Sequence, residues 1–190
     1  MPDQAQTVAK MPDQPQALVI NTTPLIALSV ATGSLEVLRV LYSRVIVTHE
    51  VQQEILAGGR HTPGVADFLT SEWLDRLAEP QAISVYLHNT LDRGEASVIQ
   101  AALAQGIARV CIDEKVGRRI ARLNGLTLTG SIGILAKAKQ AGYPLDIEQT
   151  LLRLHDQGSK GVRPLLFRSY TYPLTFELNA YTMAINITLS

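Results

Sequence analysis

Side chains whose oxygens can bind a cation stand close to the ends of apolar runs or in predicted helices. Asn21 follows the apolar run 17–20, and Asp113 ends the strand-like run 109–113, with Glu114 directly after it. Glu54 and Glu95 lie in two predicted helices, 49–57 and 93–106. Carboxylate and amide oxygens are the ligands that Mg²⁺ and Mn²⁺ prefer. If these side chains converge, they form an acidic pocket for a divalent cation.

Each acid also has a structural explanation. An acid after a strand can cap the next helix, and Glu95 stands in the first turn of a predicted helix, where negative charge is favoured. Glu50 and Glu54 are four residues apart, so one of the two can simply be a solvated residue of the helix face. The functional interpretation depends on convergence, because carboxylates crowded together repel one another unless a cation neutralises them.

The composition argues against other kinds of site. The four histidines are scattered without the spacing of zinc ligands: His49, His61, His88 and His155. A single cysteine, Cys111, cannot form an internal disulfide. The 17 basic and 17 acidic residues cancel, so any binding of nucleic acid must depend on a local patch.

The chain has the size and composition of one globular domain with tails. It has 190 residues, of which 46% are hydrophobic and 18% charged. Its first residues lack the apolar core of a signal peptide, and no run approaches the roughly 18 apolar residues of a membrane span. We therefore expect a cytoplasmic protein that does not enter a membrane.

Strand-like and helix-like segments alternate along the chain. Short apolar runs predict strands, and segments of about ten residues that end at Gly or Asn predict helices. The predicted strands are 17–20, 44–48, 109–113 and 126–129, and the predicted helices are 24–33, 49–57, 93–106, 114–124 and 131–141. This alternation indicates an α/β fold with a parallel sheet covered by helices on both faces. In such sheets the ligand crevice lies at the carboxyl ends of the strands, where Asn21, Thr48, Asp113 and Thr129 stand.

Several runs in this order resemble the uncharacterised branch of PIN-like proteins related to VapC-type toxins. They are V-I-N-T-T-P-L-I-A-L, V-T-H-E-V-Q-Q-E-I, R-G-E-A-S-V-I-Q-A-A-L, I-D-E-K-V-G-R-R-I-A and L-T-L-T-G-S-I-G-I-L-A-K-A-K-Q-A-G, within 18–158. The resemblance implies a PIN-like, Rossmann-like three-layer α/β/α fold with a parallel central sheet. It also implies Mg²⁺- or Mn²⁺-dependent cleavage of RNA, frequently by the toxin of a toxin–antitoxin pair, so RNA and a cognate antitoxin are the expected partners.

Carried over residue by residue, the resemblance implies a pocket of Asn21, Glu54, Glu95 and Asp113, with Glu114 beside the last. PIN nucleases usually have an aspartate where Asn21 stands. An amide still offers an oxygen ligand but adds no charge, so the substitution bears directly on metal affinity and activity.

The resemblance also implies roles in an attack of water on a phosphodiester. Asn21, Glu95, Asp113 and Glu114 are the predicted metal ligands, with Glu95 and Asp113 at the centre. Glu54 is expected to orient or deprotonate the water. Two hydroxyls near the strand ends can donate to a phosphate oxygen, those of Thr22 and Ser131.

A basic stripe on helix 114–124 leads away from Asp113. Its members lie at helical spacing: Lys115, Arg118, Arg119 and Arg122. The stripe can follow an RNA backbone. It can equally be the solvated face of a surface helix, and the sequence leaves both explanations open.

The ends of the chain differ from the rest. Residues 1–16 contain M-P-D-Q twice and predict a mobile leader before a PIN-like domain at 17–160. Residues 161–190 are rich in Tyr, Thr and Ile, which favour strands. We interpret this tail as a dimer contact and expect a homodimer.

Three functions are compatible with these residues. The leading one is a metal-dependent ribonuclease of toxin type. The alternative is a catalytically silent PIN-like module that binds nucleic acid or a protein partner, which Asn21 favours. A phosphotransfer enzyme on a doubly wound fold is the third, but the chain has no G-x-x-x-x-G-K-[ST] loop.

Overall fold

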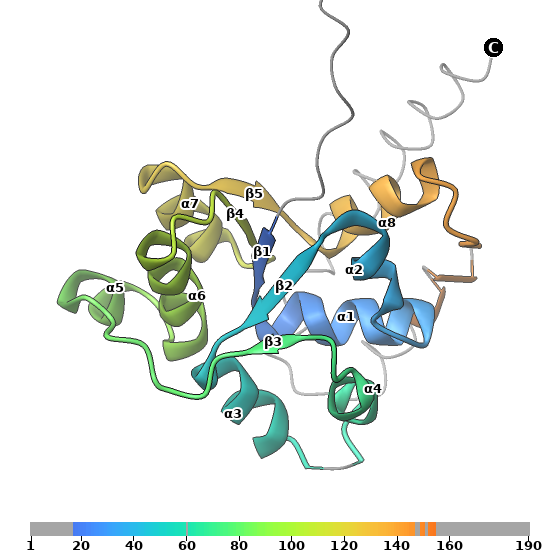
Figure 1. Ribbon diagram of the computed structural model, residues 1–190, viewed down its shortest axis with the longest axis horizontal. Helices are drawn as coiled ribbons and strands as arrows, with labels where there is room; N and C mark the ends of the chain where they lie inside the picture. Colours follow the sequence, from blue (N-terminus) through green and yellow to red (C-terminus); the bar gives the residue numbers. More distant parts are fainter. Residues whose placement is uncertain (1–16, 60, 147–148, 151, 155–190) are drawn as a thin grey trace, which may run out of the picture.

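Five parallel strands form one sheet at the centre of the protein (Figure 1). The computed structural model describes residues 17–59, 61–146, 149–150 and 152–154. The strands are β1 (Ala17–Ile20), β2 (Arg44–Val47), β3 (Asp75–Arg76), β4 (Arg109–Cys111) and β5 (Thr127–Thr129). Their order in the sheet is β3-β2-β1-β4-β5, and every pairing is parallel.

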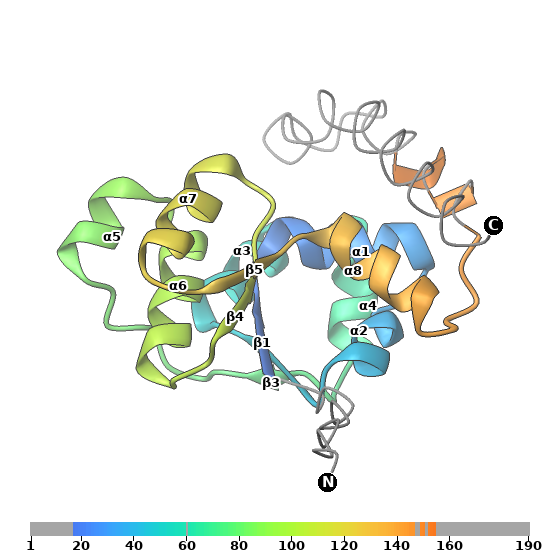
Figure 2. The same ribbon diagram turned by 90° about the horizontal axis from the view of Figure 1, so that it is seen from above.

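Helices cover the sheet from both sides. They are α1 (Thr22–Thr32), α2 (Glu36–Leu41), α3 (His49–Ala57), α4 (Val65–Thr70), α5 (Val85–Thr90), α6 (Arg93–Ala104), α7 (Lys115–Leu123) and α8 (Ser131–Gln140). Figures 1 and 2 show α5, α6 and α7 on one side of the sheet and α1, α2, α4 and α8 on the other. The predicted three-layer α/β/α fold with a parallel central sheet is therefore confirmed.

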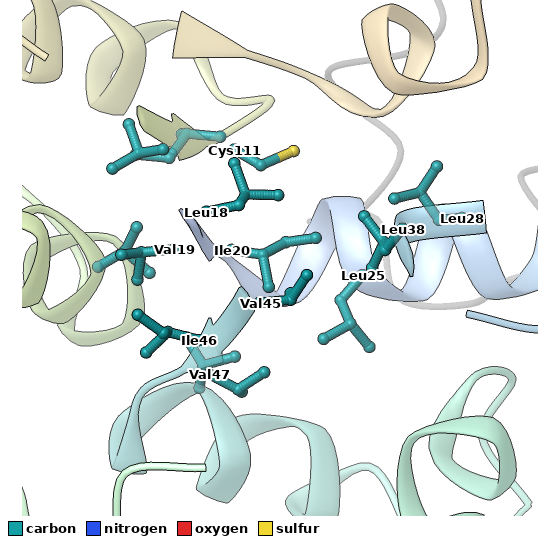
Figure 3. Packing of buried hydrophobic residues seen from close by; sticks show 14 of the residues in the cluster. Leu18, Val19, Ile20, Leu25, Leu28, Leu38, Val45, Ile46, Val47 and Cys111 are labelled. Atoms are coloured by element: carbon teal, nitrogen blue, oxygen red, sulfur yellow. The ribbon is translucent and has the colours of Figure 1, made fainter. Parts of the chain in front are cut away.

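The strands are apolar at consecutive positions because both faces of the sheet are covered. Figure 3 shows Leu18 and Ile20 of β1 pointing toward α1, where Leu25 lies, and Val19 pointing to the opposite side. All four of these side chains are fully buried. Each such burial stabilises the fold by about 1.5–3 kcal/mol, so the continuous apolar run is explained by two-sided packing.

Local signals place several helix ends where the sequence predicts them. Gly33 ends α1 with a φ of 74°, a conformation that glycine adopts without strain. Thr48 caps α3, since its hydroxyl accepts a hydrogen bond from the backbone N–H of Val51. Asp92 caps α6 through the backbone N–H of Glu95. The bounds of α3 agree with the predicted helix 49–57.

Other predicted bounds need correction. The strand predicted at 109–113 ends at Cys111, and Glu114 precedes α7 as its N-cap instead of opening it. One strand, β3, was not predicted. It has only two residues, Asp75 and Arg76, with no apolar run, and it forms because it pairs with β2. The short helices α2, α4 and α5 were not predicted either.

The leader 1–16 and the tail 161–190 lie outside the described residues, so the proposed domain division and dimer contact stay predictions. In the part of the chain that the structure describes, no helix has the length and apolar character needed to cross a membrane.

Candidate active site

Asn21 lies at the carboxyl end of β1, between the sheet and α1. Its backbone N–H donates to the carbonyl of Cys111 at 3.0 Å, which ties the end of β1 to β4. Asn21 occupies the N-cap position of α1, yet its side chain makes no capping hydrogen bond. The side chain is 3% exposed, and its Oδ1 has no hydrogen-bond partner among the described residues. A buried amide oxygen is therefore left for a ligand.

Glu54 joins three helices at this end of the sheet. The hydroxyl of Thr22, in the first turn of α1, donates to Oε2 of Glu54 at 2.6 Å. The backbone of Gly94 in α6 also forms a hydrogen bond with this carboxyl group. Glu54 lies so close to Gly94 that a Cβ at position 94 would come within 2.4 Å of Oε1. The acid of α3 thus packs directly on the start of α6.

Glu95 is the most enclosed acid of the site. It is 4% exposed, and its backbone N–H donates to Oδ1 of Asp92 at 2.8 Å. Its Oε1 has no hydrogen-bond partner among the described residues and lies against Gly117 of α7. The capping of α6 therefore accounts for the backbone of Glu95 but not for its side chain.

Glu114 faces the site from the start of α7. The hydroxyl of Thr23 donates to its Oε1, whereas its Oε2 is buried and without a partner in the described chain. Glu114 stands at the N-cap position of α7 but makes no capping hydrogen bond. The adjacent threonines Thr22 and Thr23 thus each hold one acid of the site.

Asp113 is bound to the end of β5 and the start of α8. Its Oδ1 accepts a hydrogen bond from the backbone N–H of Ser131 at 2.9 Å. Arg118 lies close by and donates to the carbonyls of Ile112 at 3.0 Å and Thr129 at 3.4 Å. Asp113 therefore stabilises the N-terminus of α8, a later helix than the one that directly follows it.

The electrostatics show that these carboxyl groups form one acidic cluster. Burial, and after it the negative charges of Asp92, Glu114 and Glu54, raise the pKa of Glu95 to about 8. Burial likewise raises the pKa of Glu54 and of Glu114, although a threonine hydroxyl opposes the rise in each case. Asp113 joins the cluster through Glu114, whose pKa it raises. Each proton or cation bound here relieves repulsion among the others.

Comparison with known protein families decides the assignment. A family model described as a PIN domain matches residues 17–163. The chain belongs to the PIN domain family. No curated protein matches its sequence. The fold is of nuclease type, and PIN domains generally are nucleases that bind nucleic acid. The relation to VapC-type toxins stays a prediction.

Sequence reasoning missed one acid of this PIN domain. Asp92 raises the pKa of Glu54, Glu95 and Glu114, so its carboxylate lies within electrostatic reach of all three. Its position before a predicted helix marked it only as a cap, and nothing local distinguishes the two roles.

Glu50 lies outside the acidic cluster, since its Oε1 accepts a hydrogen bond from the backbone N–H of Gln81 at 2.8 Å. It is 4% exposed, so it is not a solvated residue of the helix face.

The donor atoms of this PIN domain suit a hard cation. Within the described residues no three His, Cys, Asp or Glu side chains lie close enough together to hold one metal ion. Three buried oxygens of the acidic cluster nevertheless lack a hydrogen-bond partner among the described residues, those of Asn21, Glu95 and Glu114. All of them are amide or carboxylate oxygens, and their neighbours are acidic. This set of atoms fits Mg²⁺ or Mn²⁺ in chemistry.

The basic stripe on α7 divides into two kinds of residue. Lys115, Arg119 and Arg122 are exposed. Arg118 is half-buried and its guanidinium is bound to backbone carbonyls at the ends of two strands. Three of the four predicted RNA-contacting side chains are therefore accessible.

Proposed function

We propose that this PIN domain is a metal-dependent ribonuclease that cleaves RNA phosphodiesters with Mg²⁺ or Mn²⁺. The observation that carries the proposal is the acidic cluster at the carboxyl ends of β1 and β4. Burial raises the pKa of Glu54, Glu95 and Glu114 there, and the negative charge of Asp92 raises all three further. Buried oxygens of Asn21, Glu95 and Glu114 are unpartnered within the described residues. A stable fold does not need such a cluster, because like charges brought together cost free energy.

Asn21, Glu95, Asp113 and Glu114 are the residues proposed to hold the cation. A bound divalent ion supplies a water of lowered pKa and positive charge for the phosphate oxygens. Glu54 is the proposed base: burial raises its pKa, which makes its carboxylate a stronger base, and Thr22 and Gly94 hold its carboxyl group in place.

The two hydroxyls expected to contact a phosphate oxygen, those of Thr22 and Ser131, differ in their surroundings. Thr22 donates to Glu54, so its proposed role is to orient that acid. Ser131 is fully buried, and its backbone N–H faces Asp113. Contact with the RNA is assigned to the exposed Lys115, Arg119 and Arg122, with Arg118 supporting them through the strand ends.

The neutral side chain of Asn21 is compensated nearby. An aspartate at this position would add one negative charge beside Thr22. Asp92 and Glu114 add carboxylates to the same cluster, so it stays acidic with asparagine at position 21. This arrangement supports metal binding by a PIN domain with asparagine after β1.

Asp113→Asn tests the proposal. The asparagine amide oxygen can still accept the N–H of Ser131, so the fold should persist, while Mn²⁺-dependent cleavage of RNA should be abolished. The measurements are a cleavage assay across a Mn²⁺ titration and the urea midpoint of each variant. Glu72→Gln, which removes one exposed acid, is the matched control and should cleave normally. Full activity in Asp113→Asn contradicts the proposal.

A silent module is the second candidate, and the amide at Asn21 favours it. Such a protein binds RNA, or a protein partner such as an antitoxin, without cleaving. RNA retained intact at saturating Mn²⁺ would identify this function. We further propose that the ribonuclease acts as the toxin of a toxin–antitoxin pair and as a homodimer. Coexpression with the product of an adjacent reading frame and sedimentation of the full chain test these two points.

A further inference from the structure

Two acids of the cluster lie against glycines in the first turns of helices α6 and α7. A Cβ built on Gly94 of α6 would lie 2.4 Å from Oε1 and 2.5 Å from Oε2 of Glu54. A Cβ built on Gly117 of α7 would lie 2.4 Å from Oε1 of Glu95 and 2.9 Å from Cγ2 of Ile112. Contacts this short do not occur between real atoms. Any side chain at either position therefore displaces the carboxyl group.

The backbone does not require glycine at these positions. The glycines with positive φ in the described chain are Gly33, Gly59, Gly64, Gly106, Gly125 and Gly142, and neither Gly94 nor Gly117 is among them. Both lie in regular α-helix, where alanine is the more stabilising residue. Glycine therefore makes each helix less stable than alanine would. The space of the missing methyl group is occupied by a carboxyl group of the site.

The two acids differ in their room to move. Glu95 is 4% exposed, and a Cβ on Gly117 would meet the buried Ile112 as well, so a displaced carboxyl group has little space there. Glu54 is an exposed residue, and a Cβ on Gly94 would meet only its carboxyl oxygens and carbon, at the end of a flexible side chain. It can swing outward if a methyl group appears at position 94.

A third acid, Asp113, also occupies the space of a side chain that a glycine lacks. A Cβ on Gly130, the N-cap of α8, would lie 2.6 Å from Oδ1 of Asp113. Acids from α3, from α6 and from the end of β4 therefore each occupy the place of a missing side chain on the neighbouring element.

We propose that Gly94 and Gly117 are positioning residues of the site: the absence of their side chains sets where the carboxyl groups of Glu54 and Glu95 lie. The consequence of this inference for metal binding rests on the proposed function. The steric relation between the glycines and the acids is independent of it.

A folding cycle on the full 190-residue chain tests the steric relation without metal. With Glu95→Ala in place, Gly117→Ala still meets Cγ2 of Ile112 at 2.9 Å, so its effect on the folding equilibrium constant in this background measures that contact together with helix propensity. With Glu95 present, the same substitution should be at least about fivefold less favourable, because overpacking against the carboxyl group is added. Glu95→Gln keeps the bulk of the side chain without its charge, so it should behave like Glu95. Equal effects of Gly117→Ala in all three backgrounds overturn the proposal.

Mn²⁺ binding, followed by the EPR signal of the free ion, tests the functional consequence. Gly117→Ala displaces Glu95, a proposed ligand, so it should bind Mn²⁺ at least about tenfold more weakly than wild type. Gly94→Ala displaces Glu54, the proposed base, so it should fold at least as well as wild type and bind Mn²⁺ as wild type does, yet cleave RNA at least about tenfold more slowly. Gly133→Ala is the control, because its Cβ would meet only Oγ1 of Thr129, at 3.1 Å, and it should bind as wild type does.

The outcomes separate the two proposals. Coupling in the folding cycle together with weakened Mn²⁺ binding in Gly117→Ala supports the positioning role. Wild-type Mn²⁺ affinity in Gly117→Ala, or wild-type cleavage in Gly94→Ala, overturns it for the glycine concerned. If the wild-type chain itself binds no Mn²⁺, the proposed function fails, and the folding cycle alone decides whether the glycines place the acids.

Discussion

Replacing Glu95 by glutamine should stabilise the metal-free protein at high pH and leave it unchanged at low pH. The pKa of Glu95 rises from 4.5 to about 8 on folding, chiefly through burial and then through Asp92, Glu114 and Glu54. The folded protein therefore holds this proton more tightly than the unfolded chain does. Stability associated with the group is fully present below pH 4.5 and is lost as the pH rises toward about 8. Glutamine stays neutral throughout and avoids this loss.

The size of the effect follows from the shift. One pKa unit corresponds to about 1.4 kcal/mol, so the rise from 4.5 to about 8 sets an upper bound of about 5 kcal/mol. Solvent screening and the sharing of protons with Glu54 and Glu114 reduce the expected gain to about 2–3 kcal/mol. Glu95→Gln should thus match wild type below pH 4.5 and exceed it by this amount above pH 8.

Urea unfolding in EDTA measures this difference. It is repeated from about pH 4 to about pH 9, so that the range covers the pKa of Glu95 in both the unfolded and the folded state. Glu72→Gln, an exposed acid, is the control and should follow the wild-type profile. Adding Mn²⁺ should shrink the advantage of Glu95→Gln, because a cation that binds the folded protein stabilises the ionised site. Parallel wild-type and Glu95→Gln profiles across the whole pH range would refute the reasoning.

Three further substitutions probe the elements around the site. Thr48→Val should lower the free energy of unfolding by about 1–2 kcal/mol in urea titrations, since it removes a cap and a buried hydrogen bond to Ser97 of 2.7 Å; an unchanged midpoint would mean that neither bond matters. Arg118→Ala should cost about 1–2 kcal/mol, because its guanidinium bonds to two strand ends. Arg119→Ala, at an exposed position, should keep the midpoint and weaken RNA binding with a smaller salt dependence. Equal RNA affinity for Arg119→Ala and wild type would exclude α7 from the RNA contact.

Much of the fold could be predicted from the sequence because it depends on local patterns. The run 17–20 is apolar at every position, and only a strand buried on both faces needs that pattern. Thr48 followed by 49–57 and a glycine pair marks a capped and terminated helix. By contrast, β3 has two charged residues and exists because the edge of β2 is available to pair with it. A strand formed by its partner leaves no signal of its own.

The candidate site was predicted less completely. Asn21, Glu54, Glu95, Asp113 and Glu114 were chosen from strand ends and from a family resemblance, and the structure brings them to the carboxyl edge of the sheet. The metal, the RNA and the roles of these residues remain proposals.

The sequence by itself determined where four of the five strands and the longer helices form, and which side chains stand near the carboxyl ends of those strands, because burial patterns and caps involve close neighbours in the chain. Only the tertiary structure decided that Glu54 meets Thr22 and Gly94 while Glu50, one turn earlier, meets Gln81. It also decided that Asp92 acts on the acids of three helices. Those contacts depend on how helices are rotated and packed against one another, and that packing joins residues far apart in the chain.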